Sequence, residues 1–420
     1  MISSLQSLKR LLKEYNCFML KVRSRSIVAI IAVFIFSTCI DPYTPKLKGY
    51  DSLLVVDGLI TDANTSYIVK LSRTFQELYT VNSSVTDAIV FITDDIGTSS
   101  YLNNIGNGVY KTDSLEFRGM PGRTYILHIQ TKEGEIYESD PCLMKSVPDI
   151  DSVYFAKDQQ FVSNGTESQE GVSIYLDSKD GDYNSYYRWG FDETWKYNIP
   201  VPIRFDYYNE RTILHVDKVK EYCWKNRKSD EVIIQPVYPG QSARIVKEPI
   251  FFIATGESDR LMIEYSILIR QYSISKNEYD FWDNLKKVND TGSDIFASQP
   301  YSVISNMNNI NSPNEKVLGY FQVSAVKEKR IFISFNEIAR LHLPFYHNNK
   351  CNKIEAVPEA HMTFDDLYGI YCITSDNKFI EPMYNSENGR LEKLVFAKPE
   401  CTNCESSGTM TKPDFWIDLN

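Results

Sequence analysis

The chain has 420 residues, a formal net charge of −10 at pH 7 and an aromatic content of 13%. Its acidic balance disfavours nucleic acid and anionic membrane surfaces as partners, because both are bound through basic patches. The length is enough for two or three domains, each with its own hydrophobic core. Short runs rich in Tyr, Val and Ile alternate with polar turns along most of the chain, which predicts a mainly β protein.

Residues 1–38 are predicted to form a signal peptide. A basic segment precedes the apolar run of residues 27–36, and this run is too short to cross a bilayer as a permanent helix. Residues 36–39 read Phe-Ser-Thr-Cys, which resembles the cleavage box of bacterial lipoproteins, where two small residues precede the cysteine that receives the lipid. We therefore expect cleavage after Thr38 and attachment of acyl chains such as palmitate to Cys39, which would hold the protein at the outer membrane. The alternatives are an ordinary signal peptide with a chance cysteine and an uncleaved single-span anchor.

The residues on either side of this signal leave two points open. Residues 1–18 add an acid and an extra cysteine ahead of the basic segment, so translation starting at Met19 is a second interpretation. Residues 39–50 contain two prolines and no periodicity, which predicts a tether. Only one acid, Asp41, lies close behind the cysteine, whereas surface-exported lipoproteins of Bacteroidetes tend to carry an acidic cluster there. Either the periplasmic or the surface side of the membrane therefore fits the sequence.

Residues 51–147 are predicted to form a small β-sandwich. Turn signals such as Asn107-Gly108 separate short apolar runs, and residues 124–130 alternate as a strand does in the middle of a sandwich. The segment Gly108-Val-Tyr110, followed by residues 121–125, resembles the immunoglobulin-like or transthyretin-like domains of exported bacterial proteins, which usually serve as spacers or binding modules. We expect strands at residues 53–59, 67–73, 88–93, 108–111, 124–130 and 136–139.

Residues 148–420 are predicted to form a larger β-rich domain with one clear helix. The strongest strand lies at residues 260–272, where every second side chain from Leu261 to Ile269 is apolar. Directly after it, Ser275 and Glu278 form a capping box for a helix over residues 275–288, which carries an apolar stripe. Further strands are expected at residues 172–176, 186–191, 212–216, 231–237, 317–324 and 330–335.

Segments from the whole chain resemble one known family. They read YSISKNEYDFWDNLKKV, IFASQPYSVISNMNN and NEKVLGYFQVSAVKEKRIFI, with LLVVDGLITD and NSYYRW before them and CTNCESSGTMTKPDFW after them. These segments are similar to the outer-membrane lipoproteins of Bacteroidetes grouped as domain-of-unknown-function family 4249, and the likeness covers nearly the whole chain after the signal. The sequence departs from the family pattern at Ser305-Asn306, where Gly-Asn is expected. Members often lie beside TonB-dependent outer-membrane transporters, which implies a partner or accessory role. The family has no established chemistry.

The cysteines beyond Cys39 are predicted to form disulfides. An even number of cysteines in an exported protein favours a disulfide framework, although six cysteines allow fifteen pairings and the sequence does not choose among them. The pair Cys401-Thr-Asn-Cys404 could also be half of a zinc site or a redox pair, but no second pair at zinc spacing and no thioredoxin-like setting accompany it. The candidates are Cys142, Cys223, Cys351, Cys372, Cys401 and Cys404.

Two clusters of side chains could bind a ligand. Aromatic residues crowd one span, and if they were exposed they could stack on sugar rings or anchor a partner, although alternating strand positions favour a place in the core. The candidate ligand-facing residues are Tyr186, Tyr187, Trp189 and Trp195. Acids around Gly181, in residues 177–184, offer oxygen ligands for calcium, but their spacing fits a solvated hairpin turn better.

These patterns predict a non-enzymatic protein. The sequence lacks H-E-x-x-H and G-x-S-x-G motifs and a phosphate-binding glycine loop, and no cofactor or metal is expected. The leading interpretation is a lipid-anchored binding or accessory subunit of a TonB-dependent outer-membrane transporter. One alternative is a lipoprotein that captures a glycan or peptide alone. Another is a cell-envelope hydrolase, which would need two carboxylates or a nucleophile and base that converge in a pocket.

Overall fold

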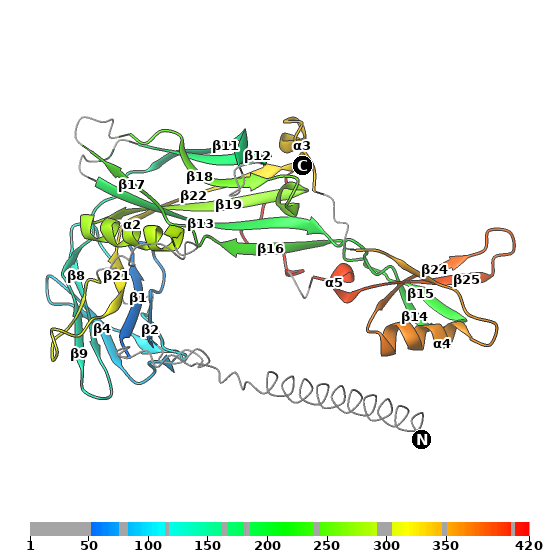
Figure 1. The fold of residues 1–420 in the computed structure, drawn as a ribbon, viewed down its shortest axis with the longest axis horizontal. Helices are drawn as coiled ribbons and strands as arrows, with labels where there is room; N and C mark the ends of the chain where they lie inside the picture. Colours follow the sequence, from blue (N-terminus) through cyan, green and yellow to red (C-terminus); the bar gives the residue numbers. More distant parts are fainter. Residues whose placement is uncertain are drawn as a thin grey trace, which may run out of the picture. The chain divides into compact units, whose positions relative to one another are not determined.

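The computed structural model confirms the mainly β class (Figure 1). The described residues belong to one compact unit, Ser52–Asn420. The predictions for the signal peptide, the tether and Cys39 lie outside them. The structure describes residues 52–74, 83–113, 117–161, 167–179, 181, 185–238, 244–291, 305–346, 351–404 and 408–419.

Two facing sheets form the N-terminal module. In the first, the strand order is β21-β1-β2-β7-β6, with β3 paired to β2; in the second it is β20-β9-β8-β4-β5, with β10 paired to β8. The first sheet consists of β1 (Leu54–Ile60), β2 (Ile68–Arg73), β3 (Ser83–Ser84), β6 (Asn103–Asn104), β7 (Val109–Lys111) and β21 (Leu318–Val323). The second consists of β4 (Ile89–Asp94), β5 (Ser99–Tyr101), β8 (Thr124–Gln130), β9 (Ile136–Ser139), β10 (Cys142–Leu143) and β20 (Met307–Asn309).

The strands β20 and β21 show that this module extends beyond residues 51–147. Strand β21 pairs in parallel with β1, and β20 pairs with β9. Gly319 has a φ of +84°, and a Cβ atom there would collide with the backbone of Val56, so only glycine fits this parallel pairing. The Asn306 side chain donates to the carbonyl of Phe321 and accepts from its N–H, both at 2.9 Å. The predicted boundary at 147/148 therefore leaves out two strands that return to the module.

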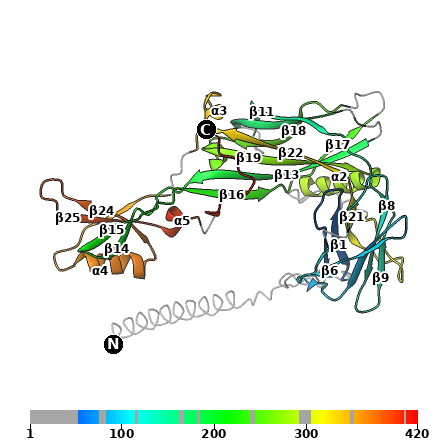
Figure 2. The ribbon, with the colours of Figure 1, turned by 180° about the vertical axis from the view of Figure 1, so that it is seen from behind.

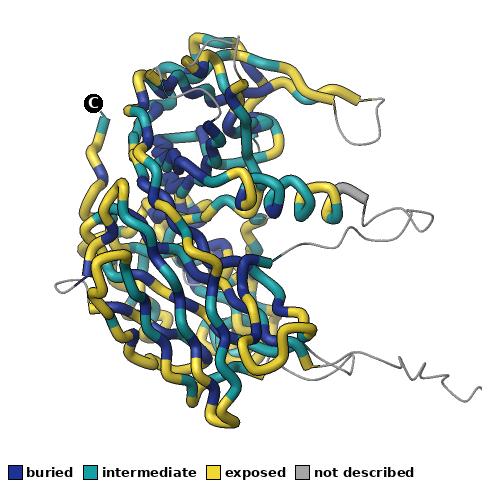
Figure 3. Tube along the Cα trace, turned by 90° about the vertical axis from the view of Figure 1, so that its left-hand side faces the viewer, coloured by how far each residue is buried: buried dark blue, intermediate teal, exposed yellow. Residues whose placement is uncertain are grey.

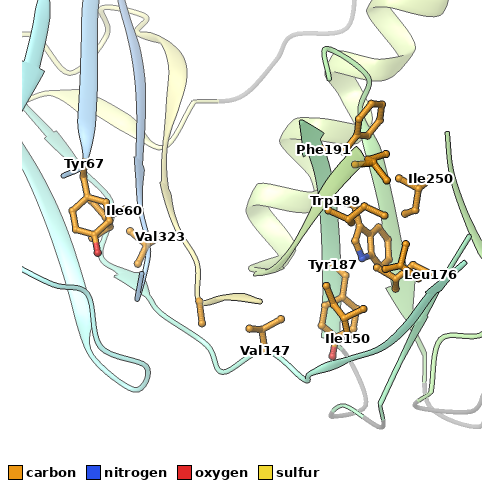
Figure 4. Packing of buried hydrophobic residues seen from close by; sticks show 14 of the residues in the cluster. Ile60, Tyr67, Val147, Ile150, Leu176, Tyr187, Trp189, Phe191, Ile250 and Val323 are labelled. Carbon is orange, nitrogen blue, oxygen red and sulfur yellow. The ribbon is translucent and has the colours of Figure 1, made fainter. Parts of the chain in front are cut away.

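A second pair of sheets forms the central module. The sheet β11-β12-β18 packs on one face of the sheet β16-β13-β19-β22, to which β17 is added beside β13 (Figures 1 and 2). Large apolar side chains such as Leu176, Trp189, Phe191 and Ile250 fill the space between them (Figure 4). The strands are β11 (Ile150–Phe161), β12 (Ser168–Ser178), β13 (Ser185–Asn198), β16 (Tyr222–Lys228), β17 (Ile233–Val237), β18 (Glu248–Ala254), β19 (Glu264–Ile274) and β22 (Val326–Ser334).

The predicted helix is confirmed as α2 (Lys276–Thr291), which lies against the end of β13. The Ser275 hydroxyl accepts the backbone N–H of Glu278 at 3.1 Å, which is one half of the predicted capping box, while the Glu278 carboxylate accepts from the Trp282 indole N–H at 3.4 Å. The Arg188 guanidinium lies between two rings, 4.5 Å from that of Tyr272 on the sheet and 4.8 Å from that of Trp282 on the helix. In Figure 3 the helix shows buried and partly buried positions along its length, whereas many turns of the chain are exposed. Short helical segments follow at η1 (Asp259–Leu261) and α3 (Phe335–Ala339).

A third, smaller core forms from two separate parts of the chain. The hairpin β14 (Phe205–Asn209) and β15 (Thr212–His215) contributes Phe205, Tyr207 and Ile213 to a cluster with Leu394 and Phe396. The other part contains β23 (Ile354–Ala356), α4 (Phe364–Tyr368), the π-helix η2 (Gly369–Thr374), β24 (Lys378–Tyr384), β25 (Leu391–Ala397) and α5 (Pro399–Thr402). The sequence pattern predicted β15 but missed α4, because a five-residue helix shows too little periodicity.

Candidate functional site

The candidate site lies on the sheet β16-β13-β19-β22, on the face that does not pack on β11-β12-β18; we call it the outer face. Successive side chains of a strand point to opposite faces, so β13 buries its odd-numbered residues from Tyr187 to Tyr197 and turns its even-numbered ones outward. The strand register places four outward residues in one row across the sheet: Lys228, Asp192, Leu268 and Arg330.

Residues 408–419, which we call the C-terminal strap, cross part of this outer face (Figure 1, red segment ending at C). Thr409 exchanges two backbone hydrogen bonds of 2.8 Å with Trp224 on β16. Further along, the Trp416 indole N–H donates to Glu264 Oε2 at 3.2 Å, and the Leu419 N–H donates to Oε1 at 2.9 Å. The Trp416 ring meets those of Trp224 and Phe332 edge-on. These contacts hold the strap against three strands of the sheet.

Between the strap and the sheet lies a cavity of about 510 Å³, which we call the strap hollow. This volume is within the range of small-ligand sites. The sheet contributes mainly polar and charged residues, and the strap contributes an apolar wall. The lining residues are Asp192, Glu193, Thr194, Asn226, Arg227, Lys228, Arg330, Pro413 and Phe415.

Arg330 is the most unusual residue of the strap hollow. Its Nη1 donates to the Ser266 hydroxyl at 3.0 Å, and its guanidinium carbon lies 3.7 Å from the centre of the Phe415 ring. Among the residues that the structure describes, no carboxylate lies within 4.0 Å of its nitrogens. Burial lowers the pKa of Arg330 below its usual value, because desolvation disfavours the cation. The Arg330 guanidinium is therefore a partly desolvated cation with no carboxylate partner among the described residues.

The acid nearest to Arg330 in the row is already neutralised. Asp192 accepts from Nη2 of Arg270 at 2.8 Å, and Nε of Arg270 donates to Glu328 at 2.7 Å. Lys228, at the other end of the row, is exposed and has no carboxylate within 4.0 Å in the described part of the chain. The outer row of the strap hollow therefore has two cations available for an external anion.

Glu193 follows Asp192 in sequence but points to the opposite face of the sheet. Its carboxylate is fully buried and accepts from Arg260 at 3.0 Å through both oxygens, from the Tyr265 hydroxyl at 2.9 Å and from Arg227 at 3.4 Å. Burial raises the pKa of Tyr265, and the neighbouring Glu193 charge raises it further. Asp192 and Glu193 therefore do not converge as the two carboxylates of a glycoside hydrolase do.

The aromatic residues predicted from the sequence to face a ligand are mostly in the core. Tyr187, Trp189 and Trp195 are only 1%, 0% and 7% exposed, so the favoured interpretation, a place in the core, is confirmed and the ligand-facing alternative is wrong for these three. Tyr186 is half-buried, with its ring 5.1 Å from that of Tyr279 on the helix. Odd-numbered positions of β13 point into the module because the facing sheet covers that side.

Four of the six candidate cysteines form disulfides. Cys223 is bonded to Cys404, with 6.1 Å between their Cα atoms, and Cys351 is bonded to Cys401, with 5.6 Å. The two cysteines of the Cys-x-x-Cys pair therefore bind different partners, which contradicts both the zinc and the redox interpretation of that pair. Cys142 and Cys372 are free thiols, so the disulfide prediction is wrong for them. Burial raises the pKa of the Cys142 thiol to about 12.

The remaining predicted sites involve metals and membranes. Asp180, Asp182 and Asn184 of the acidic turn lie outside the described residues, while Asp177 accepts from Ser152 and from the Lys247 N–H. In the described ranges, no three His, Cys, Asp or Glu side chains cluster closely enough to hold a metal ion. The helices formed by those ranges include none with the length and apolar content needed to cross a bilayer.

Sequence reasoning missed Arg330 and Phe415 as a pair. Both belong to segments that support the family resemblance, RIFI and DFW, but they lie 85 positions apart in the printed numbering. Alternation could place Arg330 on the polar side of β22. No local sequence pattern indicates that the C-terminal strap packs on the outer face of the sheet.

Comparison with protein-family models gives a match. Residues 40–330 match the model of a domain of unknown function, DUF4249. No curated protein matches the chain. The matched range includes β13, β16, β17, β19 and the part of β22 up to Arg330, whereas the strap itself lies beyond it. Because the match covers most of the sequence, the chain belongs to the DUF4249 family.

Proposed function

We propose that this chain is a non-enzymatic, lipid-anchored protein of the outer membrane, which binds a ligand or partner as an accessory subunit of a TonB-dependent transporter. The observation that carries the binding role is the strap hollow, where Arg330 lies partly desolvated without a carboxylate partner. A charge in that position is unfavourable until an external group completes it. Such an arrangement suits a binding site better than a structural one.

The anchor rests on the sequence alone. Residues 36–39 and the preceding apolar run favour acylation at Cys39, and several acyl chains give permanent attachment. The transporter partnership rests on membership of the family, whose members often lie beside such transporters. An acidic chain tethered in this way would meet its partner in the plane of the membrane.

A stand-alone capture role is the second candidate. The strap hollow favours it, because its volume is within the range of small-ligand sites and it offers hydrogen-bonding side chains beside an apolar wall. In that case the ligand would bind to the isolated protein, and no transporter would be needed for affinity.

Co-purification from membranes tests the accessory role. The full-length chain, tagged at its C-terminus, is extracted in mild detergent after crosslinking in cells, and the attached proteins are identified by mass spectrometry. We expect an outer-membrane transporter to be recovered with it in near-equal amount. Recovery of the tagged chain as a free monomer, with and without crosslinker, would contradict the accessory role. Protease treatment of intact cells then shows which side of the membrane the protein faces.

A further inference from the structure

The strap hollow has the chemistry of a carboxylate site. Guanidinium groups bind carboxylates through two parallel N–H groups. This geometry strengthens the interaction and fixes the orientation of the carboxylate. In Arg330, Nη1 is used by Ser266 and one face of the group is covered by the Phe415 ring. Its Nε and Nη2 groups have no acceptor among the described residues, and they form the edge that a carboxylate fits.

The charges around the hollow fit an anion that arrives from outside. The Asp192 carboxylate is occupied by Arg270, so it does not neutralise Arg330. Lys228 lies in the same row on the opposite edge strand, three strand spacings from Arg330, or about 14 Å. This locally positive row stands out in a chain whose net charge is −10. Electrostatic complementarity of this kind selects the sign of the ligand.

The other lining groups fit a peptide. The Thr194 hydroxyl donates to Oδ1 of Asn226 at 2.7 Å, which leaves the Asn226 amide N–H groups to donate to a carbonyl. Pro413 and Phe415 form an apolar wall on the strap, and Phe415 remains 40% exposed. A backbone with carbonyl groups, apolar side chains and a carboxylate would use all three features.

We propose that the strap hollow binds a carboxylate-bearing peptide, with the carboxylate on the Nε and Nη2 edge of Arg330. This inference rests on the proposed function only in that it requires the hollow to be a binding site. The carboxylate comes either from the C-terminus of the peptide or from an acidic side chain. Both sources present the same planar group to the guanidinium.

The test is calorimetric titration of the full-length protein in detergent at low salt. Three synthetic peptides are compared: acetyl-Ala-Phe-Ala with a free carboxylate, the same peptide as its amide, and acetyl-Glu-Phe-Ala amide. We expect at least one of the two carboxylate peptides to bind about tenfold tighter than the amide, as for a hydrogen bond to a charged group. Which of the two does so identifies the source of the carboxylate.

Two matched variants locate the interaction. R330Q removes the charge from the hollow, whereas K329Q removes one charge from the adjacent position, which points to the other face of β22 and donates to the carbonyl of Asp151. We expect R330Q to abolish the preference for the carboxylate peptide and K329Q to retain it. Thermal unfolding of both variants confirms that each is folded before titration.

Several results would overturn the inference. If the free acid, the acidic-side-chain peptide and the amide bind equally, the ligand is not selected by its carboxylate. If inorganic phosphate binds in an Arg330-dependent manner and neither carboxylate peptide does, the anion belongs to a different class. If no probe binds while the protein still co-purifies with a transporter, the inference is wrong and the accessory role stands. If R330Q and K329Q lose the preference for the carboxylate peptide to the same extent, the strap hollow is not the binding site.

Discussion

Trp416 donates its indole N–H to Glu264 at 3.2 Å, across a sequence separation of 152 residues. Through the same carboxylate, Glu264 also accepts the backbone N–H of Leu419 and lies 3.6 Å from Lys196 Nζ. One buried acid on the sheet thus holds the end of the strap. This contact keeps Phe415, the preceding residue, against Arg330.

Replacement of Trp416 by alanine should release the strap. The side chain is 5% exposed and packs against Trp224 and Phe332, so its removal should lower the free energy of unfolding by about 3 kcal/mol. Urea unfolding measures this loss, and carboxypeptidase digestion should become faster. Ile417→Ala is the control, because Ile417 is 60% exposed and should change stability by less than about 0.5 kcal/mol. Equal stability of both variants would mean that the strap is not held by Trp416.

Glu193→Gln should destabilise the central module strongly. The substitution keeps the shape of the side chain but leaves the cations of Arg260 and Arg227 without their buried carboxylate. We expect a loss of about 3 kcal/mol in the free energy of unfolding, measured with urea. Asp230→Asn also removes a partner of Arg227, but this acid is 83% exposed and should cost less than about 0.5 kcal/mol. Matching unfolding midpoints for the two variants would contradict the importance of the buried cluster.

Glu278 should make stability depend on pH. Burial raises the pKa of its carboxyl to about 7, against the opposing effect of Arg188, whereas the ordinary value is 4.5. Between these values the folded chain holds a proton that the unfolded chain has lost. The free energy of unfolding should therefore fall by up to about 3 kcal/mol as the pH rises from 4.5 to about 7. Above about pH 7 this group should cause no further change in the free energy of unfolding.

The Glu278→Gln variant isolates this contribution. Burial also raises the pKa of Glu248 to about 7, so the absolute slope of the wild type contains more than one group. The difference in unfolding free energy between E278Q and the wild type should increase in favour of the variant from about pH 4.5 to about pH 7. A difference that stays constant with pH would show that the Glu278 carboxyl is not shifted.

Peptide mapping without reduction should recover two disulfide-linked peptides, Cys223 with Cys404 and Cys351 with Cys401. The first closes a sequence separation of 181 residues, for which loop-closure entropy gives a stabilisation of up to about 5 kcal/mol. Cys404→Ser should therefore lower the unfolding midpoint clearly. Cys372→Ser, at a free thiol, is the matched control. A peptide that links Cys401 to Cys404 would contradict this arrangement.

Local patterns predicted thirteen of the twenty-five strands that the structure describes, and they missed long strands such as β11, β18 and β25. They did not predict which strands are neighbours. Alternation identified β19, yet its start was placed at residue 260 instead of Glu264. Asp259–Leu261 form a 3₁₀ turn, which the Ser258 side chain caps by accepting the Arg260 N–H. A side-chain cap of this kind competes with strand pairing and has no signature in the apolar pattern.

Long-range pairing explains the other differences. The return of β21 to β1 is a parallel contact between residues near 55 and residues near 320, and no turn signal connects them. The sequence did not predict the row from Lys228 to Arg330 for the same reason. Alternation gives the face of the sheet to which each side chain points, but it does not give the order of the strands. Pairing of Cys223 and Cys351 with the two cysteines near the C-terminus likewise depends on that order.

The most direct test of the account concerns Cys39, since the proposed role requires a folded binding module held at a membrane. Cells that express the wild type and Cys39→Ser are separated into membrane and soluble periplasmic fractions, and the amino terminus of each protein is analysed by mass spectrometry. We expect the wild type in the membrane with an acylated Cys39, and the variant in the soluble fraction. A variant that remains in the membrane, or a wild type with an unmodified amino terminus, would contradict the account.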